Sequence, residues 1–164
     1  MPIERVVVNA SPLITLFKSK LADLLPQLFT QVQIPPAVWQ EVTATKDDIA
    51  AQTLPSVSWV QKTEAVAINP AIAAWDLGAG ESEVLSYALL YPEYTAMIDD
   101  AAARRCAISL NISTLGTGGA IVLPKRRGLI VSVMEPIQSL RNAGLWLSEE
   151  LVQLLKQQAG EQSS

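Results

Sequence analysis

Residues 5–9, RVVVN, constrain the fold of this chain more than any other stretch. Consecutive valines predict a strand covered on both faces, which is typical of a parallel sheet between helices. Ser11 and Pro12 follow almost at once, and a serine N-cap with proline at the first helical position predicts the start of a helix. A strand that leads through a tight turn into a helix favours the α/β class.

Further expected elements alternate along the chain. Strands are expected at 32–34, at 57–63 as an exposed or edge strand, at 95–100 and at 112–116. Helices are expected from 11, at 21–28, 37–44, 81–91, 101–110, 133–144 and 148–160, with one helical turn within 47–52. Ser148 is the expected N-cap of the last helix, and glycines end the last two. Pro124 argues against a regular helix over 120–128.

The composition favours one compact domain over residues 1–164. The chain has 164 residues, of which 49% are hydrophobic, and no linker or repeat divides it. Residues 161–164 are expected to fray. No apolar run is long enough to span a membrane, and the N-terminus lacks the features of a signal peptide, so a soluble cytoplasmic protein is expected.

The residue types present leave few kinds of chemistry open. The chain has no histidine and only one cysteine, Cys106, which is expected to be a small core residue. An internal disulfide is therefore excluded, and a zinc site or a nucleophile paired with histidine has little support. Acid–base or metal chemistry must rest on carboxylates.

The net charge of −4 argues against nucleic-acid binding by the whole surface, because neutralising phosphates requires clustered cations. Two local candidates for RNA contact remain, one formed by Arg104 and Arg105 and the other by Lys125, Arg126 and Arg127. For the second group, the alternative is an interaction with the end of a helix. For the first, one arginine could pair with the preceding acids. Thr117, in the glycine turn, could bind phosphate or satisfy backbone groups.

Asp99 and Asp100 end the expected strand over 95–100 and precede a helix. The carboxyl edge of a parallel sheet is where open α/β folds bind ligands. An aspartate there could instead cap the following helix, but two acids exceed what one cap requires.

Two glutamates occupy apolar helix faces. Glu41 lies between Val38 and Val42, and the alternative places it at the rim of the helix. Glu81 lies in the first turn of its helix, where the helix dipole is an alternative explanation, and Glu83 is expected to face water. We predict that the acids on apolar faces converge with the two aspartates. A site built only from oxygen ligands suits Mg²⁺ or Mn²⁺, which implies metal-assisted hydrolysis of a nucleic-acid backbone.

The sequence resembles the PIN-domain superfamily of metal-dependent ribonucleases, and in particular its toxin-like branch of short prokaryotic proteins. The resemblance spans roughly 5–160 and rests on VVVNASPLI, IPPAVWQEV, LGAGESEVLSYAL, MIDDAAARRCA, the GTGG turn with KRRGLI, and SLRNAGLWLS. It implies a three-layer α/β/α sandwich with a central parallel sheet, an acidic site for Mg²⁺ or Mn²⁺, and cleavage of RNA. Many relatives are the toxin of a toxin–antitoxin pair, so an antitoxin protein and a homodimer are the implied partners.

Carried over by position, the resemblance implies a catalytic and metal-binding set. It comprises Glu41, Glu81, Asp99 and Asp100, with Asn9 as a further metal ligand and Ser11 in support. The family has an aspartate where this chain has Asn9. An amide oxygen can coordinate a cation, but it carries no charge to offset it. The sequence therefore predicts either an attenuated ribonuclease or a non-catalytic module that binds RNA or a protein.

Overall fold

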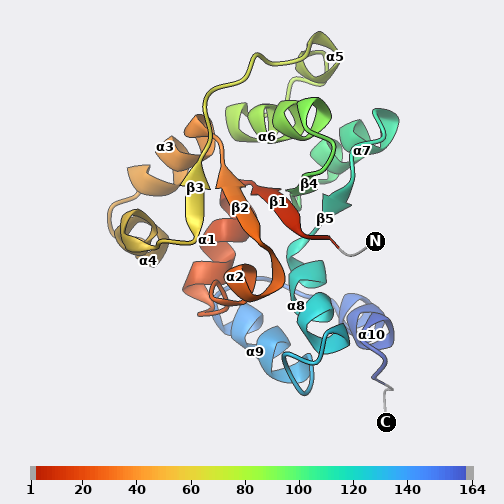
Figure 1. Ribbon diagram of the computed structural model, residues 1–164. Helices are drawn as coiled ribbons and strands as arrows, with labels where there is room; N and C mark the ends of the chain where they lie inside the picture. Colours follow the sequence, from red (N-terminus) through yellow and green to blue (C-terminus); the bar gives the residue numbers. More distant parts are fainter. Residues whose placement is uncertain (1–2, 162–164) are drawn as a thin grey trace.

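The computed structural model describes residues 3–161, which form five strands and ten α-helices (Figure 1). The strands are β1 (Arg5–Val8), β2 (Gln31–Ile34), β3 (Val60–Lys62), β4 (Thr95–Met97) and β5 (Thr114–Leu115). The helices are α1 (Ala10–Lys18), α2 (Leu24–Leu28), α3 (Pro36–Ala44), α4 (Ile49–Thr53), α5 (Pro70–Ala73), α6 (Ala79–Leu90), α7 (Ala101–Ser109), α8 (Thr117–Arg126), α9 (Met134–Asn142) and α10 (Glu149–Gln158), with a 3₁₀ turn at Leu54–Ser56.

The five strands form one parallel sheet in the order β3-β2-β1-β4-β5. β1 lies in the centre, and Val7 is in register with Gln33 of β2 and Ala96 of β4. Its three valines are fully buried, which confirms the prediction of a strand covered on both faces. β3 is an edge strand, as predicted, although it is shorter than expected.

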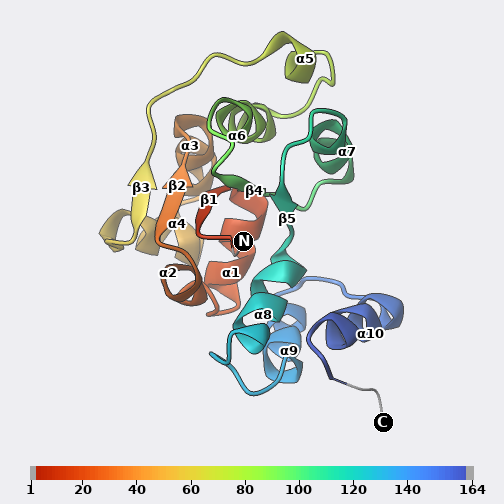
Figure 2. The same cartoon turned by 45° about the vertical axis from the view of Figure 1, so that its right-hand side comes forward.

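Helices cover both faces of the sheet, so the fold is a three-layer α/β/α sandwich (Figures 1 and 2). α6 packs on β1 and β4 and against α7. α1, α3 and α4 pack with one another on the other face. Cys106 of α7 is fully buried in this core, as expected.

The last three helices form a smaller apolar cluster of their own beside the sheet. Ile121 of α8, Ile137 and Leu140 of α9 and Leu155 of α10 are almost fully buried in it. Figure 2 shows α8 running from the sheet toward these helices, and α8 also contacts α2. Gly118 lies against the Leu155 side chain, and the absence of a side chain at this glycine lets α8 and α10 come close together.

The predicted ends of the last two helices are confirmed. Ser148 caps α10 by accepting a hydrogen bond from the backbone N–H of Leu151. Gly144 and Gly160 follow α9 and α10 with φ of +99° and +78°, a backbone conformation that favours glycine. Among residues 3–161, no helix has the length and apolar character needed to cross a bilayer.

Three expectations about local structure were wrong. The N-cap of α1 is Asn9, not Ser11 as expected, because the backbone oxygen of Asn9 already accepts from the N–H of Leu13 and the helix begins at Ala10. α8 continues through Pro124, which lies in its last turn and removes only the hydrogen bond to residue 120. Glu161, expected in a frayed tail, accepts hydrogen bonds from the Ser132 hydroxyl and the Val133 N–H. The rest of the expected tail, 162–164, lies outside the described residues.

Candidate functional site

Asn9 lies at the carboxyl end of the central strand and is only 4% exposed. Its backbone N–H donates to the carbonyl oxygen of Met97 at 3.0 Å, which joins the end of β1 to the end of β4. Within residues 3–161, its side-chain amide makes no hydrogen bond, and because no fully buried side-chain nitrogen or oxygen there lacks a partner, the amide atoms reach solvent. Ser11, the expected supporting residue, is exposed on the first turn of α1. The structure thus holds a buried amide at this edge with its polar atoms available.

The side chain of Glu41 comes to the same place as Asn9. A Cβ atom built on Gly80 of α6 would lie 3.0 Å from Asn9 Oδ1 and 3.5 Å from Glu41 Oε1. Gly80 therefore leaves open the space that both oxygens face. Glu41 itself is exposed, while Val38 and Val42 are buried, so the alternative that placed Glu41 at the rim of α3 is the right one.

α6 itself carries two glutamates near its start, Glu81 and Glu83. Glu81 is half-buried in the first turn of α6, and its carboxylate lies beside Gly78. Glu83 accepts a hydrogen bond from the backbone N–H of Ala37 at 3.0 Å. It thereby satisfies one of the free amides in the first turn of α3 and fixes α3 against α6. The expectation that Glu83 faces water was wrong.

The two aspartates after β4 have different surroundings. Asp100 is the N-cap of α7, because its carboxylate accepts from the N–H of Ala103 at 2.9 Å. Asp99 accepts from Thr117 with both oxygens, one from the N–H at 2.8 Å and the other from the hydroxyl. The structure therefore assigns the helix cap to Asp100 and joins Asp99 to the start of α8.

The predicted acids do not all meet at one point. Within residues 3–161, no group of three or more His, Cys, Asp or Glu residues is arranged so that it could hold a metal ion. The structure instead brings Asn9 and Glu41 together around Gly80, and Asp99, Thr117 and Arg104 together around Gly116. The catalytic and metal-binding roles of the four acids stay predictions.

Arg104 and Arg105 are exposed on α7. The Arg104 guanidinium lies near Gly116, 3.6 Å from the position of a Cβ atom built there. Neither arginine lies within 4.0 Å of an acid in the described part of the chain, where Arg141 and Glu149 form the one ion pair. The alternative in which one of them pairs with the preceding aspartates is therefore wrong.

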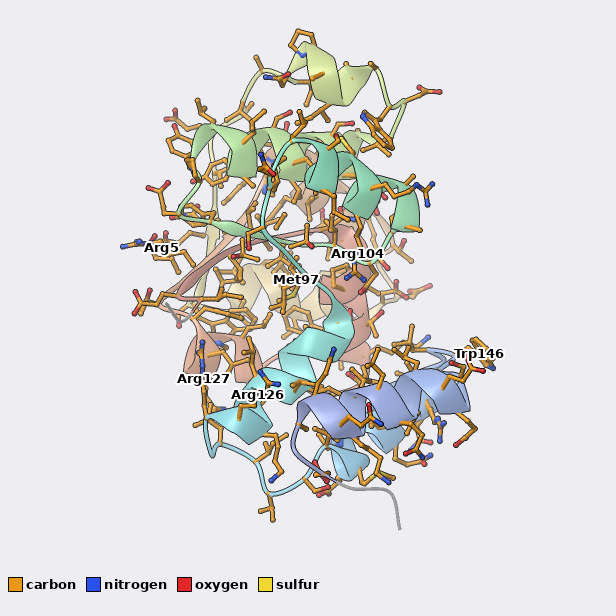
Figure 3. All side chains as sticks on the ribbon, turned by 90° about the vertical axis from the view of Figure 1, so that its right-hand side faces the viewer. Arg5, Met97, Arg104, Arg126, Arg127 and Trp146 are labelled. Carbon is orange, nitrogen blue, oxygen red and sulfur yellow. The ribbon has the colours of Figure 1, made fainter. Side chains whose placement is uncertain are left out.

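The second basic group lies at the opposite edge of the sheet (Figure 3). Arg127 donates to the backbone oxygens of Ile3 and Leu28, which precede β1 and β2, and Arg126 donates to the backbone oxygen of Gln158, the last residue of α10. Figure 3 shows both arginines at the far end of α8 from Arg104. They tie helices and loops together, whereas the two expected roles were contact with RNA and an interaction with the end of their own helix. Contact of these arginines with RNA stays a prediction. Lys125, beside them on α8, is half-buried.

Two features of this site were missed in the sequence. Gly80 belongs to the motif LGAGESE, yet only the packing of α6 against α3 shows why a side chain there would intrude. The sequence predicts Thr117 as a ligand of phosphate or of backbone groups, whereas its hydroxyl binds Asp99. A signal that could have indicated this pairing is position: Asp99 follows β4, Thr117 follows β5, and these two strands are neighbours in the sheet.

A family model described as a PIN domain matches residues 5–161 of the chain. The chain belongs to the PIN-domain family. This confirms the resemblance and agrees with the parallel sheet and its two helical layers. PIN domains are generally nucleases, and the edge that holds Asn9, Glu41 and Asp99 in this PIN domain is the carboxyl edge, where ligands bind in open α/β folds. No curated protein and no solved structure matches the chain.

Proposed function

We propose that this PIN domain is a metal-dependent endoribonuclease that uses Mg²⁺ or Mn²⁺. The observation that carries the proposal is the pair of oxygens, Asn9 Oδ1 and Glu41 Oε1, that face the space left open by Gly80. They come from different elements and meet at the edge of the sheet. Neither makes a hydrogen bond within residues 3–161, so both have lone pairs available for a ligand.

The donor set fits a cation that keeps much of its water. Mg²⁺ usually binds proteins through one or two carboxylates and completes its coordination with water and substrate phosphates. Asn9 and Glu41 supply an amide oxygen and a carboxylate, and Glu81 is the nearest further acid along α6. A cage of three or more carboxylates is not present in residues 3–161. The proposal therefore includes weak metal binding in the absence of RNA.

The loss of the family's aspartate lowers the expected metal affinity. Two unit charges about 4 Å apart interact by about 4 kcal/mol at an effective dielectric constant near 20, and a divalent ion doubles that gross value before hydration is subtracted. Asn9 offers a dipole in place of that charge. Glu41 is then the main source of negative charge beside the open space.

The chemistry divides between the bound cation and the side chains. A bound Mg²⁺ or Mn²⁺ supplies a water of lowered pKa and polarises the phosphate. Glu41 Oε1 can accept a proton from an attacking water, whereas Asn9 Oδ1 can only orient its ligand. Asp99 fixes the first turn of α8 through Thr117, and Arg104 lies where it can donate to a backbone phosphate.

The biological role that we propose is that of a toxin in a toxin–antitoxin pair, acting on RNA in the cytoplasm. An antitoxin segment would occupy the same edge of the sheet and block access of RNA. A homodimer is a further proposed assembly. These proposals rest on the family, whose short prokaryotic members include many such toxins.

A non-catalytic PIN-like module that binds RNA or a protein is the second candidate. Asn9 favours it, because a neutral amide replaces a charged ligand at a buried position of the site. This module predicts binding of RNA or a partner without products that depend on metal. The two candidates therefore differ in one measurable property, the cleavage of RNA.

The experiment that tests the proposal measures cleavage of labelled RNA with Mn²⁺, with Mg²⁺ and with a chelator. Wild type should form products only with metal, and Glu41→Gln should lose about 100-fold or more in rate, which is the typical contribution of a general base. Glu64→Gln is the matched control, because Glu64 is an exposed glutamate on the loop after β3. Cleavage that persists in Glu41→Gln, or the absence of cleavage by wild type and by Asn9→Asp, contradicts the proposal.

A further inference from the structure

α3 begins without a cap of its own. Its N-cap residue is Pro35, whose side chain has no hydrogen-bonding group, and Pro36 at its first position has no N–H to donate. The N–H of Trp39 already donates to Pro35 O at 3.0 Å. Ala37 therefore carries the first backbone amide that the helix cannot satisfy by itself, and this amide is open to an acceptor from another element.

Glu83 of α6 supplies that acceptor. Its Oε1 accepts from the Ala37 N–H at 3.0 Å, between residues 46 positions apart in the chain. The carboxylate is half-buried and forms no ion pair in the part of the chain that the structure describes. Its negative charge also interacts favourably with the positive end of the α3 dipole. Glu83 is thus the cap of α3, provided by a neighbouring helix.

The same two helix faces meet again one turn further on, at the candidate site. Glu41 follows Ala37 by four residues on α3, and Gly80 precedes Glu83 by three on α6, so each pair shares one face of its helix. A Cβ atom built on Gly80 would lie 3.5 Å from Glu41 Oε1. The capping hydrogen bond and the approach of Glu41 to Gly80 are therefore two contacts of one packed helix pair (Figure 1).

We propose that Glu83 is a positioning residue for the candidate site, which holds α3 so that Glu41 Oε1 faces the space beside Asn9. The inference rests on the proposed function, because it names a residue that prepares Glu41 for a cation. A rise of about 1.5 Å per residue places Glu41 about 6 Å from Ala37 along the helix axis, so a shift of the first turn is carried to Glu41.

Glu83 acts through α3 and not by its own contact with the space. The three atoms nearest to a Cβ built on Gly80 belong to Asn9, Val38 and Glu41, and none belongs to Glu83. Removal of the capping contact therefore leaves every group that faces the space in the chain. It changes only how α3 presents Glu41.

The length and the charge of the Glu83 side chain make separable predictions. Glu83→Gln keeps an oxygen at the same reach and removes the charge, whereas Glu83→Asp keeps the charge and shortens the side chain by one methylene. Positioning by a hydrogen bond requires reach, so Gln should preserve the site and Asp should disturb it. A direct effect of the Glu83 charge on a bound cation would give the opposite order.

The first measurement needs no metal. The side-chain amide resonance of Asn9, in NMR spectra of the isotope-labelled full chain, reports the position of Glu41, and Glu41→Gln gives the reference for a changed neighbour. The resonance should move in Glu83→Asp and in Glu83→Ala and should stay near its wild-type position in Glu83→Gln. Glu150→Ala is the matched control, because Glu150 is an exposed glutamate of α10 that makes no hydrogen bond within residues 3–161.

The second measurement is the affinity for Mn²⁺ by calorimetry in the Asn9→Asp protein, in which binding is expected to be tighter. Addition of Glu83→Asp should weaken binding by about tenfold, the low end for residues that orient a metal ligand. Addition of Glu83→Gln should leave the affinity nearly unchanged. The reversed order of the two affinities would overturn the inference.

An Asn9 resonance at its wild-type position in both Glu83→Asp and Glu83→Ala would also overturn it, even if both variants are less stable, since Glu83 would then only hold the fold together. A resonance that follows reach, in a protein that neither binds Mn²⁺ nor cuts RNA, keeps the positioning role and loses the nuclease proposal. Metal-dependent cleavage by a protein whose Asn9 resonance does not respond to Glu83 keeps the nuclease proposal and loses this inference.

Discussion

Thr117 donates to both carboxylate oxygens of Asp99, with its backbone N–H to one and its hydroxyl to the other. This relationship joins the loop after β4 to the first turn of α8. It also leaves Asp99 with fewer lone pairs for a metal than the sequence led us to expect.

Replacement of Thr117 by valine removes the hydroxyl and keeps the shape of the side chain. Thr117 is 2% exposed while Asp99 is exposed, so Asp99 would lose a partly buried, charge-assisted hydrogen bond. We expect the free energy of unfolding to fall by about 1.5–3 kcal/mol, measured by urea denaturation. Thr53→Val is the control, because the half-buried Thr53 side chain makes no hydrogen bond within residues 3–161. Equal losses of unfolding free energy in the two variants would show that the hydrogen bond to Asp99 adds nothing to stability.

Replacement of Gly80 by alanine places a methyl group in the space between Asn9 and Glu41. Its Cβ would lie 3.0 Å from Asn9 Oδ1, which is tight, and 3.4 Å from a methyl carbon of Val38. We expect RNA cleavage to fall by about tenfold or more, because a small displacement of reacting groups is costly. Stability should change by less than about 1 kcal/mol, since alanine favours the helix and offsets part of the crowding.

Gly78→Ala makes the same chemical change two residues earlier and serves as the comparison. There the added methyl would meet only the end of the Glu81 side chain, which can move away. We expect a smaller loss of cleavage than in Gly80→Ala. A larger loss would show that the position of Glu81 matters more than the space between Asn9 and Glu41.

Arg127 is predicted to contribute to stability through its two hydrogen bonds to backbone oxygens. Arg127→Gln should lower the free energy of unfolding by about 1–2 kcal/mol, at the low end for charged donors because the side chain is exposed. Arg105→Gln is the matched control, since Arg105 is exposed and forms no ion pair in the described part of the chain. Thermal and urea unfolding of the two variants give the comparison, and indistinguishable values would contradict the structural role.

The free energy of unfolding is predicted to depend on pH through the carboxyl group of Glu161. Burial raises the pKa of its carboxyl, but hydrogen bonds from Ser132 and Val133 and the charges of Lys125 and Lys156 outweigh it, so the pKa lies below the usual 4.5. A lowered pKa stabilises the fold at pH above the unfolded value and loses that effect as pH falls through the folded value. Wild type should therefore exceed Glu161→Gln in stability at pH 6–7, and the difference should shrink below about pH 4.5. A difference that does not depend on pH would contradict this account.

Much of the fold was predictable because its strands and helix ends depend on local sequence patterns. The run of valines in β1 sets a strand buried on both faces, and Ser148, Gly144 and Gly160 set helix ends by hydrogen bonding and backbone conformation. Pro124 was misjudged because its cost depends on its distance from the end of the helix. That distance was set by the packing of α8, which the sequence does not display.

The site was less predictable because it depends on contacts between distant segments. Asp100 rather than Asp99 caps α7, because Asp99 instead binds Thr117, which lies 18 residues further along the chain. Arg127 was a candidate for RNA contact by charge alone, and only the course of α8 carries it to the opposite edge of the sheet. The 82% exposure of Trp146 was not predictable from the sequence, since a tryptophan between two leucines is expected in a core.

The central claim is that Asn9 and Glu41 hold a divalent cation at the end of β1. Titration of Mn²⁺ by calorimetry on wild type, Asn9→Asp and Glu41→Gln tests it most directly. We predict weak binding by wild type, binding at least about tenfold tighter by Asn9→Asp because a charge replaces a dipole, and loss of binding by Glu41→Gln. Identical titrations for all three proteins would contradict the account.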